Sequence, residues 1–110
     1  MAKVRTYSRY STEAASLLGK QIRLGRKERK WAEQDLADRA GISRYTVQKI
    51  EKGDLTCAIG LVFEVAALVG VKLFDGESSS LSTHLERADD KLSLLPKTIH
   101  KSKKPVDDDF

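Results

Sequence analysis

The segment from Glu33 to Lys52, EQDLADRAGISRYTVQKIEK, constrains the fold most, because it has the form of two short helices joined by a glycine turn. Gly41 can adopt the left-handed backbone conformation at little steric cost. A small residue, Ala37, lies in the first helix. Apolar residues recur at helical spacing, at Leu36, Ala40, Ile42, Val47 and Ile50. The pattern is typical of a helix-turn-helix, which places its second helix in the major groove of DNA.

The composition fits one small globular domain. The chain has 110 residues, of which 40% are hydrophobic. Cys57 is the only cysteine, which excludes an intrachain disulfide and favours a reducing compartment. No apolar run reaches the roughly 20 residues of a transmembrane helix, and residues 1–11 lack the apolar stretch of a signal peptide. We therefore expect a cytoplasmic protein that does not bind a membrane.

The basic charge is concentrated in the half that holds the helix-turn-helix pattern. The net charge is +4, but residues 1–55 carry 13 Lys and Arg against 7 Asp and Glu, whereas residues 56–95 carry 3 against 6. A basic face attracts polyanions and releases counterions when it binds them. Charge alone is equally consistent with a solvated surface, and the motif favours nucleic acid.

Helical spacing predicts an all-α chain with five helices. They are expected at 12–29, 33–40, 43–52, 58–69 and 80–94. The fourth should turn inward the residues Ile59, Val62, Phe63, Ala66 and Val69. Residues 71–74 have high β-propensity, so we expect either a coil on the core or a short strand paired with a second subunit.

Four parts follow from this pattern: a basic arm at 1–11, a helix-turn-helix domain at 12–74, a C-terminal helix at 75–95 and a flexible charged tail at 96–110. The C-terminal helix carries a short heptad seam formed by Leu81, Leu85, Ala88, Leu92 and Leu95. This seam either docks on its own domain or forms a dimer. The basic arm either enters the minor groove or stays free.

The second helix of the motif supplies the candidate DNA-reading residues. If Val47 and Ile50 are buried, the outward side chains are Arg44, Tyr45, Gln48 and Lys49. Arg and Lys suit the O6 and N7 acceptors of guanine, and Gln suits adenine. Tyr45 suits a thymine methyl group or a phosphate.

From Leu18 to Val71, about half of the chain, the sequence resembles the DNA-binding domain of the Cro and repressor family, also called the XRE family. The resemblance is carried by LGKQIRLGRKER, W-x-x-x-DLADRAGIS, TVQKIEKG and VFEVAALVGV. It implies a five-helix fold like that of the lambda repressor, and a transcriptional regulator that binds double-stranded operator DNA as a homodimer without a cofactor.

The resemblance also implies roles for individual residues. It places the main base contacts at Arg44, Tyr45 and Lys49, and an ion pair between Arg26 and Glu51 that ties the first helix to the third. Phosphate contacts are expected from hydroxyl and basic side chains, namely Ser43, Thr46, Lys52, Arg29 and Lys30.

Two positions depart from the family's pattern. The cap of the second helix is Ala32 instead of Ser, Thr or Asn, and a missing cap costs about 0.5–2 kcal/mol. The next residue is Glu33 instead of Gln, and its carboxylate should repel the DNA backbone. We therefore expect weak phosphate anchoring by this helix, for which Arg29, Lys30 and the basic arm would compensate.

The C-terminal half resembles HipB-type antitoxins, which repress their own operons and hold a HipA-type kinase toxin. Two alternatives stand beside this: a repressor without a toxin, or an interaction module that mainly inhibits a kinase. The tail either keeps the protein soluble or inserts into the partner through its last residues, Asp107, Asp108, Asp109 and Phe110.

No residues suggest an enzyme or a metal site. His84 and His100 are far apart, and Cys57 has no second ligand nearby. No nucleophile, base and orienting residue can be named together.

Overall fold

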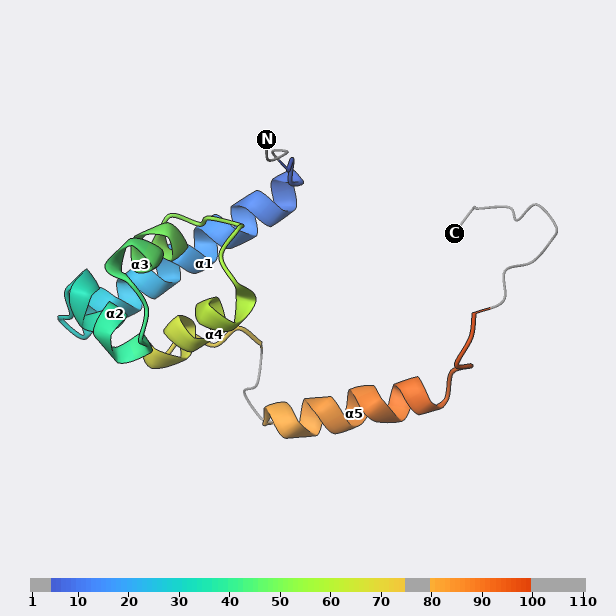
Figure 1. Cartoon of the computed structure of the whole chain (residues 1–110). Helices are drawn as coiled ribbons and strands as arrows, with labels where there is room; N and C mark the ends of the chain where they lie inside the picture. The colour runs from blue at the N-terminus through green and yellow to red at the C-terminus, as the bar shows by residue number, and fades with distance from the viewer. Residues whose placement is uncertain (1–4, 75–79, 100–110) are drawn as a thin grey trace. The chain divides into compact units, whose positions relative to one another are not determined.

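The computed structural model describes residues 5–74 and 80–99, which form five α-helices and no β-strand (Figure 1). The helices are α1 (Arg9–Glu28), α2 (Glu33–Ala40), α3 (Arg44–Glu51), α4 (Ile59–Leu68) and α5 (Leu81–Ser93). The prediction of an all-α chain is therefore confirmed. The chain divides into two compact units, Met1–Asp75 with α1 to α4 and Gly76–Phe110 with α5.

The first unit is built around one small apolar core. α2 packs against both α3 and α4, and α1 packs against α3. The buried apolar side chains are all aliphatic: Ile22, Leu36, Ala37, Val47, Ile50, Val65, Ala66 and Val69. Each helix contributes the residues that recur at helical spacing on one face, so hydrophobic burial fixes how α2 and α3 sit on the scaffold.

The face that α4 buries differs from the prediction. Ile59 and Phe63 are exposed, whereas Val65, which was not expected inside, is fully buried. The stripe that faces the core runs through the half-buried Val62 and the buried Val65, Ala66 and Val69, a spacing of three, one and three residues. Ile59 and Phe63 lie beside this stripe, and the Phe63 ring meets the ring of Phe74 at a centroid distance of 6.5 Å.

The N-terminal arm is shorter than predicted. α1 begins at Arg9 instead of Thr12, because Ser8 is its cap and the Ser8 side chain accepts a hydrogen bond from the Ser11 N–H at 3.1 Å. Residues 9–11 are thus helical, and residues 1–4 lie outside the described residues.

Residues 71–74 are coil in the single chain, in agreement with the first of the two alternatives, and pairing of this segment with a second subunit stays a prediction. The Val71 N–H donates to the Ala66 carbonyl at 2.8 Å, which closes the C-terminus of α4. Val71 and Leu73 then pack against the core. Apolar burial holds this segment without a paired strand.

Candidate nucleic-acid interface

α3 is held at its start by a cap and along one side by the core. The Ser43 hydroxyl accepts a hydrogen bond from the Thr46 N–H at 3.1 Å, and Val47 and Ile50 are buried. The opposite side presents the four predicted reading residues, of which Arg44 and Tyr45 are exposed and Gln48 and Lys49 are half-buried. The structure therefore brings these four side chains together on one helix face.

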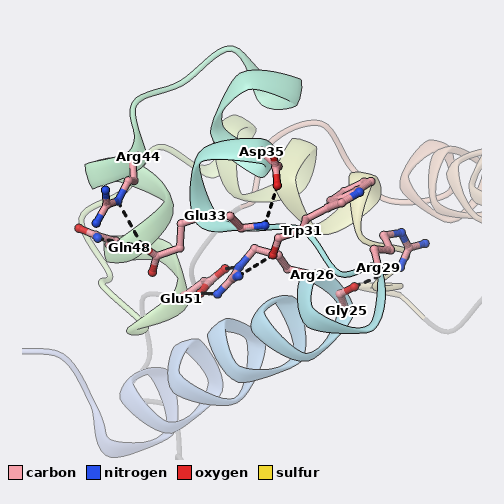
Figure 2. Close-up of polar contacts among 10 residues, drawn as sticks. Gly25, Arg26, Arg29, Trp31, Glu33, Asp35, Arg44, Gln48 and Glu51 are labelled. Atoms are coloured by element: carbon pink, nitrogen blue, oxygen red, sulfur yellow. Dashed lines mark hydrogen bonds and ion pairs between the residues drawn. The ribbon is translucent and has the colours of Figure 1, made fainter.

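A buried ion pair fixes the far end of α3 to α1. Arg26 donates from Nε to Glu51 Oε2 at 2.6 Å and from Nη2 to Oε1 at 3.0 Å, and the two side chains are only 7% and 5% exposed. Arg26 Nη1 also donates to the Trp31 carbonyl at 2.8 Å (Figure 2). The hydrogen bonds with Glu51 raise the pKa of Arg26. This bidentate geometry locks α1, α3 and the loop before α2 together.

The start of α2 is stabilised without a capping side chain at Ala32. Asp35 accepts a hydrogen bond from the Ala32 N–H at 2.7 Å, which is one half of a capping box (Figure 2). Trp31, half-buried against the core, lies under the guanidinium of Arg39, 4.1 Å from the ring centroid. These contacts offset part of the loss of helix stability that the missing cap at Ala32 is expected to cause.

Glu33 has a role that sequence reasoning missed. Its Oε1 accepts a hydrogen bond from Gln48 Nε2 at 3.0 Å and lies 3.3 Å from Arg44 Nε (Figure 2). The hydrogen bond from Gln48 is the main cause of a lowered pKa at Glu33, and the nearby charge of Arg44 adds to it. The carboxylate expected only to repel DNA thus holds two of the predicted reading residues. The sequence did hold a signal for this contact: the first residue of α2 is the acidic Glu33, and the first residue of α3 is the basic Arg44.

The other two reading residues lie around a shallow hollow at the C-terminal half of α3. Lys49 Nζ is 5.6 Å from the centroid of the Tyr45 ring and 4.0 Å from Asp54 Oδ2. Lys52, Gly53 and Gln48 complete the lining. Hydrogen bonds from Thr56 are the main cause of a lowered pKa at Asp54, so this carboxylate is ionised beside Lys49 at neutral pH.

The five predicted phosphate-contacting residues fall into two groups. Ser43, Thr46 and Lys52 lie on α3 or at its caps, although the Ser43 and Thr46 hydroxyls already hydrogen-bond each other at 2.9 Å. Arg29 and Lys30 follow α1, and Figure 2 shows Arg29 beside Gly25, away from Arg44. Arg29 Nη1 donates to the Val69 carbonyl at 2.7 Å, so this guanidinium caps the C-terminus of α4. Asp107, Asp108, Asp109 and Phe110 lie outside the described residues.

Among residues 5–74 and 80–99, no cluster of three His, Cys, Asp or Glu side chains is arranged to hold a metal ion. Within the same ranges, no helix is both long enough and apolar enough to span a membrane.

The fold and the geometry of α2 and α3 define a helix-turn-helix domain. Comparison with known families agrees, because residues 22–75, just under half of the chain, match the model of a helix-turn-helix family. The chain thus contains a helix-turn-helix domain. It is also 42% identical over 43 residues to an uncharacterised HTH-type transcriptional regulator of Methanocaldococcus jannaschii. This match covers 39% of the chain and 65% of the relative's length.

Proposed function

We propose that this protein is a sequence-specific DNA-binding transcriptional regulator. The observation that carries the proposal is the row of solvent-facing side chains on α3, held on a helix that is fixed at both ends. Arg44, with its side chain 59% exposed, offers a guanidinium to guanine, and Tyr45, 67% exposed, offers an apolar ring to a thymine methyl group. The name of the relative from Methanocaldococcus jannaschii describes a protein of the same class.

Replacement of Arg44 tests the proposal. DNA duplexes enriched from a random library by the wild-type protein would be compared with scrambled duplexes. We expect Arg44→Ala to cost about 1–3 kcal/mol on the enriched duplex and to relax the preference at one base pair. Lys52→Ala is the contrast, because loss of a phosphate contact should weaken binding to every duplex alike and lower the salt slope by about 1. An unchanged sequence preference in Arg44→Ala would show that Arg44 does not read a base.

The regulator would act as a homodimer on a palindromic operator and repress by blocking a promoter. If both copies of α3 face one side of the duplex, the half-sites lie about 10 bp apart. The apolar stripe of α5 supports this assembly, because within its own unit α5 leaves Leu81, Leu85 and Leu92 exposed.

More specifically, we propose that the protein is an autorepressing antitoxin of the HipB type and that its second unit also binds a kinase toxin. Its support is the sequence resemblance together with the second compact unit, Gly76–Phe110, that follows the helix-turn-helix domain along the chain. Co-expression with the neighbouring reading frame, followed by pull-down, tests it. We expect a kinase-like partner to copurify with the full chain and to be lost when residues 105–110 are deleted. Recovery without a partner would favour a repressor that has no toxin, and retention after the deletion would exclude the tail as the anchor.

A further inference from the structure

Glu33 lies where a helix normally attracts the DNA backbone. It is the first residue of α2, and the free N–H groups and the dipole at a helix N-terminus favour an anion such as phosphate. In this chain the anion is already present as a side chain, because the pKa of Glu33 is lowered and its carboxylate is ionised at neutral pH. A phosphate that approaches the start of α2 therefore meets a negative charge.

The same carboxylate holds Arg44 in a particular orientation. The contact uses Nε of the guanidinium, 3.3 Å from Glu33 Oε1. An arginine held at Nε still has both terminal nitrogens available, and these two donors form the pair that reads O6 and N7 of guanine. Because one edge is already anchored, the side chain loses less rotational freedom when it binds a base.

Gln48 is held by the same oxygen atom. Its Nε2 donates to Glu33 Oε1 at 3.0 Å, and Figure 2 shows both contacts converging on the one carboxylate. The Glu33 side chain is 32% exposed, so the cluster lies at the surface and partly shielded. The position of two reading residues from α3 thus depends on one residue from α2.

We propose that Glu33 is a positioning residue that sets sequence specificity: it aims Arg44 at base edges and keeps the Arg44 charge from serving as a general phosphate contact. This inference rests on the proposed function. It assigns a use to the acid that departs from the family's pattern. Random DNA gains little from Arg44, because its charge is already balanced and the approaching phosphate is repelled. A duplex with guanine at the matching position gains the full bidentate contact.

The test compares wild type, Glu33→Gln, Glu33→Asp and Arg44→Ala on an enriched duplex, on a scrambled duplex and on one changed at the base pair that Arg44 reads. That base pair is the one at which Arg44→Ala loses preference. Glu33→Gln should bind scrambled DNA more tightly, with a salt slope larger by about 1, and its preference at this base pair should fall about five- to tenfold. Glu33→Asp keeps the charge but withdraws the carboxylate, so it should lose preference without the gain on scrambled DNA.

Three comparisons separate this role from others. Glu64→Gln removes an equal charge from an exposed position on α4 and should leave the preference unchanged. In the Arg44→Ala background, Glu33→Gln should no longer alter the preference, because Glu33 acts through Arg44. The melting temperature of Glu33→Gln should stay close to that of Glu64→Gln, as expected for a surface pair.

Preserved preference in Glu33→Gln would overturn the inference, and so would an equal loss of preference in the presence and absence of Arg44. Failure of the proposed function would look different. In that case the wild-type protein would enrich no sequence from the random library, whereas failure of the inference alone leaves wild type and Glu33→Gln equally selective.

Discussion

At the scale of single residues, the candidate interface depends on two carboxylates that hold arginines. Glu51 binds Arg26 inside the molecule, with both side chains under 10% exposed, whereas Glu33 binds Arg44 at the surface. The buried pair is costly to break, because a lone buried charge cannot recover its hydration. The exposed pair contributes little to stability, about 0–1 kcal/mol, and its proposed role is to orient Arg44.

The buried pair gives a stability prediction. Glu51→Ala should lower the free energy of unfolding by about 3–5 kcal/mol, because Arg26 is left buried without its partner. Chemical denaturation monitored by circular dichroism measures the change. Glu28→Ala, at an exposed acid near the end of α1, should change it by less than about 0.5 kcal/mol. The double variant Arg26→Met/Glu51→Leu should be more stable than Glu51→Ala, and a less stable double variant would contradict the assignment.

At the scale of elements, the spacing between helices is set by small residues as much as by the apolar core. α1 passes so close to the end of α3 that a Cβ on Gly19 would lie 2.6 Å from the Glu51 carbonyl oxygen. This close approach carries Arg26, seven residues further along α1, into reach of Glu51. The α1–α3 contact therefore depends on the absence of one side chain.

Gly19→Ala tests this close approach. Although alanine favours helices, the added methyl group must push α1 away from the backbone of α3, so we expect a loss of about 1–3 kcal/mol in the free energy of unfolding. Gly60→Ala on α4 is the matched control, because a Cβ there meets no atom within 4 Å. This control should be neutral or slightly stabilising. Equal effects of the two substitutions on thermal unfolding would show that the approach of α1 to α3 is not tight.

At the scale of the whole molecule, the two units differ in what their helices bury. α1 to α4 surround a common core, whereas α5 buries none of its own residues within its unit. A thirteen-residue helix with an apolar stripe needs a second surface to be stable in water. The proposed homodimer would supply such a surface.

A charge on the stripe of α5 tests this role. If α5 forms the dimer, Leu85→Asp should shift the protein from dimer to monomer in sedimentation or light scattering, because a carboxylate cannot be buried unpaired in an apolar interface. The α1–α4 unit should keep its unfolding temperature. Ser82→Asp places the same charge near the start of α5 and outside the heptad positions, so it should leave the dimer intact. A dimer that survives Leu85→Asp would assign the interface elsewhere.

The sequence by itself determined the helices and the turn between α2 and α3, because helical periodicity, capping residues and Gly41 act over a few neighbouring positions. It also placed Arg44, Tyr45, Gln48 and Lys49 on one face, since Val47 and Ile50 had to be buried. Only the tertiary structure decided which face α4 buries and what Glu33 does. Ile59 and Phe63 are as apolar as their neighbours, and only packing against the rest of the core selects Val65 over them. Glu33 and Arg44 are eleven residues apart, and their contact exists because the core sets α2 and α3 at one fixed angle. Helices and turns depend on residues that are neighbours in the sequence, whereas contacts between helices depend on how the whole core fills space.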